Sequence, residues 1–113
     1  MNEKKIKLIL RDFAKKRNWD QFHTLKNLAS ALSVEASELL EIFQWSDNSL
    51  EIGKNKTLKK KVSDEVADIM LYLIRFSDKA NIDIEMACLN KIKKNEKKYP
   101  VSKFKGLSKK YNE

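Results

Sequence analysis

Residues 34–45, VEASELLEIFQW, and residues 63–73, SDEVADIMLYL, decide the fold of this 113-residue chain. In each stretch the apolar residues recur at the spacing of one helix face. Between the stretches lies a polar segment, residues 46–56, that reads as a loop. We therefore predict two long helices, over about residues 24–45 and 57–80, that run antiparallel on either side of this loop. The candidate N-caps of the two helices are Thr24 and Thr57.

Two further helices are expected outside this hairpin. One covers about residues 2–17, and the other ends near Tyr99, because the ring of Pro100 cannot continue a helix. The chain has only two glycines and one proline, a composition that favours helices over turn-rich sheets. We predict an all-α, four-helix bundle-type domain over residues 1–100 with a central antiparallel hairpin. An irregular basic tail is expected over residues 101–113.

Composition also limits the class of protein. The chain contains no run of about 18 apolar residues, so no membrane span is predicted. The N-terminal residues lack the apolar stretch of a signal peptide. The single cysteine, Cys88, rules out an internal disulfide, and its apolar register with Ile84 and Ile92 predicts that it is buried in the core. We expect a cytoplasmic protein.

The positive charge is concentrated near the C-terminus. The formal net charge is +8, and nine lysines lie between residues 91 and 110, against the single acid Glu96. Such a cluster suits polyanions, whether nucleotide phosphates, nucleic acid or an acidic membrane surface. A solvated lysine-rich helix face is the alternative interpretation.

Two acidic pairs, Glu35 with Glu38 and Glu65 with Asp68, interrupt the apolar rows of the two long predicted helices. Residues three apart share a helix face, so each pair directs two carboxylates the same way. Glu38 and Glu65 stand at similar distances from the loop, so antiparallel helices bring the pairs to one level. Buried carboxylates are costly unless they are paired or bind a metal. The pattern predicts a site for a hard divalent cation such as Mg²⁺, and hence phosphate chemistry.

With these motifs in view, the chain resembles the MazG-like all-α nucleoside triphosphate pyrophosphohydrolases. Their shared pattern is E-x-x-E followed by E-x-x-D, with a helix–loop–helix interval between. The dCTP pyrophosphatase branch is similar in further segments, which here read RDFAKKRNWDQFH (11–23), FQW (43–45), LYL (71–73) and LNKIKKNEKKYP (89–100).

The resemblance implies an enzyme that hydrolyses a nucleoside triphosphate, dCTP or a related pyrimidine deoxynucleotide, to the monophosphate and pyrophosphate. It implies that Mg²⁺ is held by Glu35, Glu38, Glu65 and Asp68. Glu38 is the glutamate that we expect to act as base toward the attacking water. Family members are oligomeric, so a homo-oligomer, dimer or tetramer, is expected.

The resemblance also assigns substrate-binding roles. Trp19 and Trp45 would enclose the base, and Tyr72 would line the sugar pocket one turn after Asp68. The residues that would contact phosphate oxygens are Lys91, Asn95 and Lys98.

Departures from the dCTP-preferring branch concern the base. Leu10 stands where that branch has a histidine that reaches the base pocket, and Lys93 replaces an acidic residue. His23 matches the family's QFH segment, but no chemical step is assigned to it. These changes leave the predicted metal site intact, and they leave the preferred base open.

Two other functional classes share features with this sequence. A di-iron bundle needs Glu-x-x-His pairs, and the chain has one histidine, His23, with Asp20 three residues before it. A small basic nucleic-acid-binding helical protein fits the net charge. That alternative leaves the four inner carboxylates unexplained, because carboxylates on a binding face repel the phosphate backbone.

Overall fold

The computed structural model describes residues 1–45 and 52–106, and every regular element in these ranges is helical. The all-α prediction is therefore confirmed. The chain divides into two compact units, Met1–Asn81 and Ile82–Glu113. Part of the predicted loop, residues 46–51, and the end of the predicted tail, residues 107–113, lie outside the described residues.

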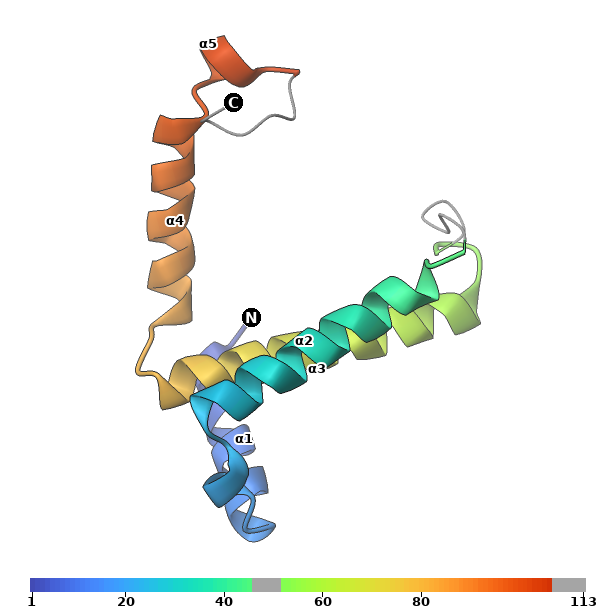
Figure 1. Ribbon diagram of the computed structural model, residues 1–113, viewed down its shortest axis with the longest axis vertical. Helices are drawn as coiled ribbons and strands as arrows, with labels where there is room; N and C mark the ends of the chain where they lie inside the picture. Colours follow the sequence, from blue (N-terminus) through green and yellow to red (C-terminus); the bar gives the residue numbers. More distant parts are fainter. Residues whose placement is uncertain (46–51, 107–113) are drawn as a thin grey trace. The chain divides into compact units, whose positions relative to one another are not determined.

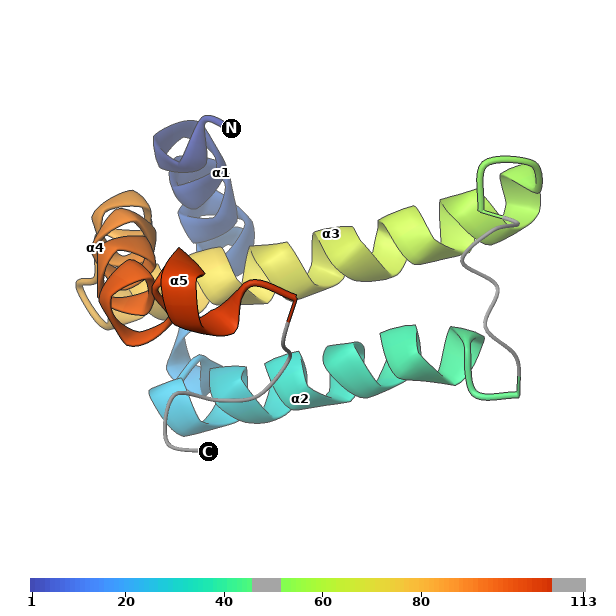
Figure 2. The ribbon, with the colours of Figure 1, turned by 90° about the horizontal axis from the view of Figure 1, so that it is seen from above.

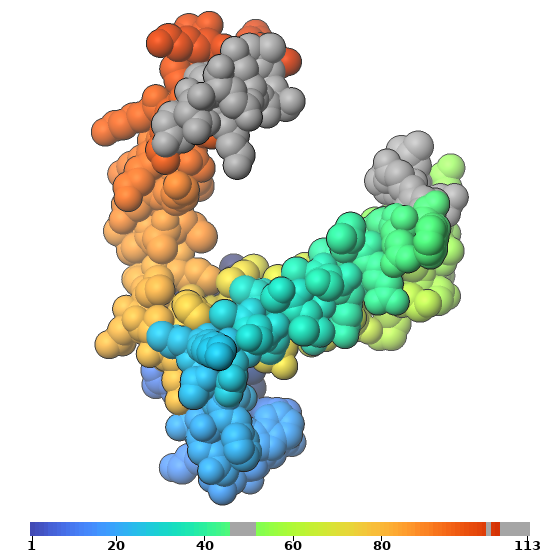
Figure 3. Space-filling view, in the orientation of Figure 1, coloured from blue at the N-terminus to red at the C-terminus, as the bar shows by residue number. Residues whose placement is uncertain are grey.

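The first unit is built on the predicted hairpin. Helix α2 (Leu25–Ile42) and helix α3 (Lys56–Lys79) lie side by side in opposite directions, as Figures 1 and 2 show. In the space-filling view of Figure 3, side chains of α2 lie in front of α3 and cover part of it. The hairpin brings residues far apart in the sequence to one level, which is what the acidic pairs require.

Side-chain caps fix where the two helices begin. The Thr24 hydroxyl accepts a hydrogen bond from the Asn27 backbone N–H at 3.1 Å, so the predicted cap of α2 is confirmed. At α3 the prediction of Thr57 is wrong. The helix begins at Lys56, two residues before the position at which a Thr57 cap would start it. Asn55 is therefore the cap, and its side chain accepts a hydrogen bond from the Leu58 N–H at 3.1 Å.

Helix α1 (Glu3–Lys16) packs against the C-terminal half of α3. Arg11 holds Asp78 with both ends of its guanidinium, at 2.6 and 2.8 Å, which is the bidentate geometry that suits arginine. The deepest apolar side chains come one from each helix of this unit: Ala14 from α1, Leu28 from α2 and Ile74 from α3. The core is therefore small and lies at the end of the hairpin that α1 covers.

A Schellman turn closes α1 and leads into the short 3₁₀ helix η1 (Asp20–Phe22). The Asn18 N–H bonds the Lys15 carbonyl at 3.1 Å and the Trp19 N–H bonds the Ala14 carbonyl at 2.9 Å. Asn18 takes the left-handed conformation, φ 55°, that this motif needs after the helix end. The turn thereby fixes the position from which Trp19 projects.

The second unit contains α4 (Ile84–Lys98) and the short α5 (Val101–Phe104). The Asp83 side chain caps α4, and the helix ends before Pro100 as predicted. Cys88 is exposed, so the prediction that it lies in the core is wrong, because no described side chain of α4 is buried. The tail also differs from the prediction, since its first four residues form α5. None of the helices in the described ranges has both the length and the apolar character needed to cross a bilayer.

Candidate functional site

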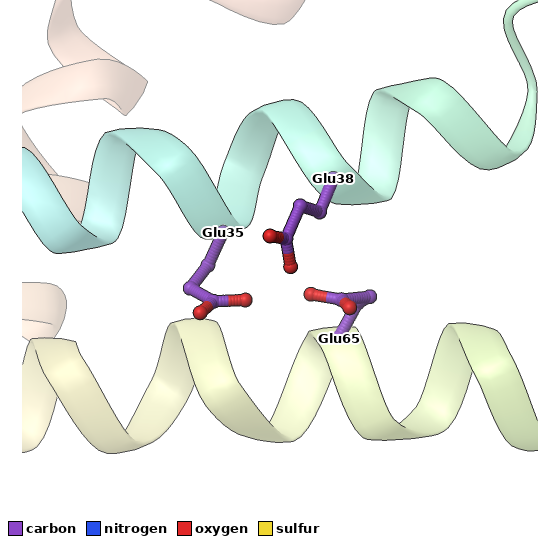
Figure 4. A group of neighbouring side chains, drawn as sticks. All are labelled: Glu35, Glu38 and Glu65. Carbon is purple, nitrogen blue, oxygen red and sulfur yellow. The ribbon is translucent and has the colours of Figure 1, made fainter.

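Three of the four predicted carboxylates meet between α2 and α3. Glu35 and Glu38 project from α2 and Glu65 from α3, and Figure 4 shows the three pointing toward one another. One oxygen of each lies within 4.8 Å of an oxygen of the others. Glu35 and Glu65 are half-buried, whereas Glu38 is exposed. The antiparallel hairpin therefore delivers the convergence that the spacing of the pairs predicted. We call these three residues the carboxylate cluster.

Two carboxylate oxygens of the cluster lack hydrogen-bond partners. The Oε2 atoms of Glu35 and Glu65 are buried and have no hydrogen-bond partner. A hydrogen bond with Glu65, burial and the neighbouring Glu38 together raise the pKa of Glu35 to about 7. Glu35 is therefore neutral through the mildly acidic range and becomes ionised as the pH rises past about 7.

These observations fit a hard divalent cation. Within the described ranges, no Lys or Arg side chain forms an ion pair with Glu35, Glu38 or Glu65. Buried oxygens without partners and carboxylates without counter-charges are the groups that a cation with oxygen ligands would satisfy. The donor set is all oxygen, as Mg²⁺ prefers, and it contains no sulfur or imidazole ligand.

Asp68 does not join the cluster. It lies one turn along α3 from Glu65, but its exposed side chain lines a separate cavity between α3, α1 and η1. The sequence could not show this, because helix spacing gives a direction and not the element that lies opposite. Helix α1 packs on that side of α3, so Asp68 lines the cavity and not the space where the three glutamates meet.

The cavity that Asp68 lines has a volume of about 510 Å³, within the range of small-molecule sites. Its walls are mostly apolar, with a few polar groups at one side. The residues that line it are Ile6, Ile9, Leu10, Phe13, Ala14, Trp19, His23, Asp68, Leu71, Tyr72 and Arg75. We call this space the α1–α3 cavity.

The MazG-like family model matches residues 30–113. The chain belongs to the MazG-like family.

Named relatives of this MazG-like chain include dCTP pyrophosphatase 1 of Homo sapiens, 32% identical over 110 residues, and that of Bos taurus, 33% identical over 111 residues. Each alignment covers 96% of this chain and 65% of the relative, so the chain spans about two-thirds of the length of these relatives. A crystal structure of a pyrophosphatase from Archaeoglobus fulgidus is similar at a TM-score of 0.74 and 44% identity. That similarity covers 81% of this chain and 86% of the other.

Two predicted substrate residues of the MazG-like chain line the α1–α3 cavity. Trp19 is 46% exposed and packs edge-on against Phe13, with ring centroids 5.7 Å apart. The Arg17 guanidinium lies over the other aromatic ring of this pair, 3.5 Å from the Phe13 centroid. Tyr72 is half-buried one turn beyond Asp68. An aromatic wall therefore exists where the resemblance placed base and sugar contacts.

Trp45 is not among the residues that line the α1–α3 cavity of the first unit. Trp45 is 90% exposed, three residues past the end of α2. Lys91, Asn95 and Lys98 lie on α4, in the second unit, and their contact with phosphate stays a prediction. Lys91 and Asn95 are exposed on that helix, and Lys98 is half-buried.

The sequence interpretation missed a charged network at the wall of the α1–α3 cavity. Arg75 of α3 is 5% exposed and binds Asp20 through one terminal nitrogen and His23 through Nε–H, at 3.1 Å from Nδ1. Lys79 also reaches Asp20, at 3.0 Å. Lys79 and Arg75 lower the pKa of Asp20, although burial opposes them. The signal was present, because an arginine inside the apolar run LYLIRF needs buried partners.

Lys61 is a second residue that the sequence interpretation missed. It lines a hollow of about 400 Å³ together with Glu38, Glu41, Ile42 and Glu65. Among the described residues that line this hollow, Lys61 is the basic one, and Glu38 and Glu65 of the carboxylate cluster line it as well. It lies one turn before Glu65 on α3.

Proposed function

We propose that this MazG-like chain is a Mg²⁺-dependent nucleoside triphosphate pyrophosphohydrolase acting on dCTP or a related pyrimidine deoxynucleotide. The observation that carries the proposal is the carboxylate cluster with its unpartnered buried oxygens, one helical turn from a cavity with an aromatic wall. The cluster suits the metal and phosphates, and the cavity suits a nucleoside. The names of the relatives support the same reaction class.

The acidic residues of the site have different roles in the proposed reaction. Glu35 and Glu65, with their inward oxygens, would hold the cation in the free protein, and Asp68, which lines the cavity, would join them when the nucleotide is bound. Mg²⁺, when bound, supplies positive charge that neutralises phosphate oxygens and the departing pyrophosphate. Glu38 is the exposed member, so it is the carboxylate that solvent water reaches.

Glu38 therefore acts as the general base. It removes a proton from a water whose oxygen attacks the α-phosphorus, and the bond from that phosphorus to the bridging oxygen breaks. The electron pair leaves with pyrophosphate, and the nucleoside monophosphate remains. A positioned base of this kind contributes roughly 10²- to 10⁴-fold in rate.

The cavity accounts for the nucleoside. Trp19 and Tyr72 offer flat apolar surface on which a base and a sugar can pack, and base stacking on an aromatic ring contributes about 1–3 kcal/mol. Leu10 adds an apolar wall at the position where the related branch has histidine. Phosphate oxygens would be met by Lys61, and by Lys91, Asn95 and Lys98 from the second unit.

We also propose that the active form is a homo-oligomer. Trp45, Leu40 and Val34 of the hairpin expose 90%, 70% and 55% of their surface. Exposed apolar side chains in such numbers mark an interaction surface. A second copy would cover them and could bring Trp45 against a bound base. Light scattering should give a mass that is a multiple of 13.2 kDa, and a monomer under assay conditions would contradict this proposal.

Pyrophosphate release from a panel of NTPs and dNTPs, with Mg²⁺ and with EDTA, tests the reaction. We expect metal-dependent release that favours dCTP. Glu38→Gln should lose roughly two to four orders of magnitude in kcat while keeping its helical circular dichroism. Asp64→Asn is the matched control, because Asp64 adjoins Glu65 in sequence but is exposed and pairs with Lys60 at 3.7 Å. Release that persists in EDTA, or in Glu38→Gln, would contradict the proposed site.

A further inference from the structure

The guanidinium of Arg75 is buried and has partners on three sides. Its Nε–H donates to Nδ1 of His23, and one terminal nitrogen donates to Asp20. The other terminal nitrogen lies 3.7 Å from a carboxylate oxygen of Asp78, which Arg11 also holds. Arg75 is thus fixed from three sides, and it fixes His23 in turn.

The hydrogen bond from Arg75 determines which nitrogen of the His23 imidazole carries the hydrogen. Arginine keeps all its N–H groups in proteins and never accepts a hydrogen bond. The His23 nitrogen that faces Arg75 must therefore be the bare acceptor, so the ring is neutral and carries its hydrogen on Nε2. Burial, Arg75 and Lys79 lower the pKa of His23, while Asp20 acts in the opposite direction. The tautomer is set by the fold.

His23 is also one of the few polar residues that line the α1–α3 cavity. The other polar groups there are Asp68, which only accepts when ionised, the Tyr72 hydroxyl, the Trp19 indole N–H, and Arg75, whose nitrogens already have partners. A neutral imidazole N–H is thus a directional donor in a space whose walls are otherwise mostly apolar. Such groups fix the orientation of a ligand in a pocket of this kind.

We propose that His23 is a base-recognition residue, whose Nε2–H donates to an acceptor atom of the nucleobase in the α1–α3 cavity, and that Arg75 is the positioning residue that imposes this tautomer. The proposal rests on the proposed function, because it takes the bound molecule to be a nucleotide. It assigns to a neutral histidine the recognition of a carbonyl oxygen or ring nitrogen.

Nuclear magnetic resonance of the tag-free full chain, labelled with ¹⁵N in the imidazole ring, tests the tautomer directly. The chain has one histidine, so a single ring system is observed. We expect the pattern of a neutral ring protonated on Nε2 in the free protein, and a mixture of tautomers in Arg75→Gln. A wild-type ring protonated on Nδ1, or on both nitrogens at neutral pH, would overturn the proposal.

Ligands then test the contact with the base. Addition of dCMP with Mg²⁺ should shift the Nε2 proton resonance, whereas inorganic pyrophosphate with Mg²⁺, which has no base, should leave it in place. dCMP keeps the base of the proposed substrate and lacks the bond that would be hydrolysed. Equal shifts with both ligands, or none with dCMP, would overturn base recognition.

Kinetics on dCTP separate recognition from a structural role. His23→Leu should raise KM about 2- to 12-fold, the factor that one net hydrogen bond represents, with kcat little changed. His23→Gln should recover most of the loss, because its amide oxygen can accept from Arg75 while its amide N–H donates to the base. Lys26→Ala, an exposed residue in the first turn of α2, is the control. Equal loss in the Gln and Leu variants would indicate packing alone and overturn the proposal.

The two proposals fail in different ways. Hydrolysis of dCTP without a dCMP-induced shift at His23 would overturn this inference and leave the proposed function standing. A dCMP-induced shift in a protein that hydrolyses no nucleotide would support base recognition and overturn the hydrolase. Absence of both would overturn both.

Discussion

At the scale of single residues, Glu35 links the metal site to pH. Its ordinary pKa of 4.5 rises to about 7 in the folded protein, first because of its hydrogen bond with Glu65 and then because of burial. The folded state therefore binds more protons than the unfolded state between these two values. The contribution of Glu35 to stability is full below about pH 4.5 and is lost as pH rises toward 7.

We accordingly predict that the metal-free protein unfolds at a lower temperature at about pH 8 than at about pH 5.5. Glu35→Gln should flatten this dependence, because the amide cannot ionise. Mg²⁺ should raise the melting temperature more at the higher pH, where the cluster is charged. Thermal unfolding in EDTA and in Mg²⁺ measures both effects, and Glu41→Gln, exposed on the same helix, is the control. A Glu35→Gln variant that keeps the wild-type pH dependence would contradict this account.

Asp68 gives a second prediction at this scale. Because it lines the α1–α3 cavity and lies outside the carboxylate cluster, Asp68→Asn should keep the Mg²⁺-induced rise in melting temperature. Its hydrolysis of dCTP should nevertheless fall by at least an order of magnitude, as expected when a group near the reacting phosphate is lost. Glu65→Gln should lose both. Loss of the Mg²⁺ effect in Asp68→Asn would show that Asp68 holds the ion in the nucleotide-free protein.

The contrast between these residues shows what sequence can predict about the site. Convergence of Glu35, Glu38 and Glu65 followed from helix periodicity and the distance of each pair from the loop. The location of Asp68 did not, because α1 packs against that side of α3 through tertiary contacts that no local spacing encodes. Arg75 escaped notice for a related reason, since its partners Asp20 and His23 lie more than 50 residues away in sequence.

At the scale of elements, the Schellman turn after α1 is the device that aims Trp19. Asn18 provides the left-handed backbone and the Trp19 N–H closes the turn on the carbonyl of buried Ala14. The geometry is local, but it sets the aromatic wall of the α1–α3 cavity. The junction is therefore a point where a backbone change should reach the binding of substrate.

We predict that Asn18→Val, which strains a positive φ, destabilises the protein by about 1–2 kcal/mol and raises KM for dCTP. In a domain of roughly 100 residues each kcal/mol lowers the melting temperature by about 4–8 °C. Asn18→Gly accepts the same backbone and should be close to wild type in both measurements. If the Val and Gly variants melt together, the turn does not carry the strain assigned to it.

Elements were predicted better than their surroundings. The hairpin, the Thr24 cap and the stop before Pro100 depend on neighbours within a few residues, and the structure confirms each. The burial of Cys88 depends on what covers α4, and its apolar register could not supply that. Periodicity identifies the apolar face of a helix. Whether that face is buried depends on another element that packs against it.

At the scale of the whole molecule, the formal net charge of +8 acts on any polyphosphate that approaches. Long-range attraction raises association rates and is screened over about 8–10 Å at physiological salt. The same charge prompted the nucleic-acid-binding alternative. The salt dependence of binding distinguishes attraction of a nucleotide substrate from nucleic-acid binding. A protein that neutralises several DNA phosphates loses affinity for DNA steeply as the salt concentration rises.

We predict that kcat/KM for dCTP falls several-fold as salt rises from about 0.05 to 0.3 M, while kcat at saturating substrate changes little. Paired variants of Lys93 and Lys97, two exposed residues of α4, to Gln should reduce this slope. A matched pair of changes at Lys4 and Lys5 of α1 tests whether net charge or its location matters. A salt-independent kcat/KM would argue against steering.

Trp45 is too exposed to support the core of its own chain. Trp45→Ala should change the free energy of unfolding of the isolated chain by no more than about 0.5 kcal/mol. If a second copy completes the site with Trp45, the variant should raise KM with little change in kcat, and light scattering should report whether assembly is also weakened. An unchanged KM would remove Trp45 from the substrate site.

The position of the carboxylate cluster has one more consequence, for the lifetime of the protein. A cation held by Glu35 of α2 and Glu65 of α3 would tie the two helices together as a removable cross-link, closing a chain segment longer than the hairpin's own turn. Ligands that bind only the folded state reduce the population open to proteolysis. The supply of free divalent metal would then govern how long each copy survives as well as how fast it works.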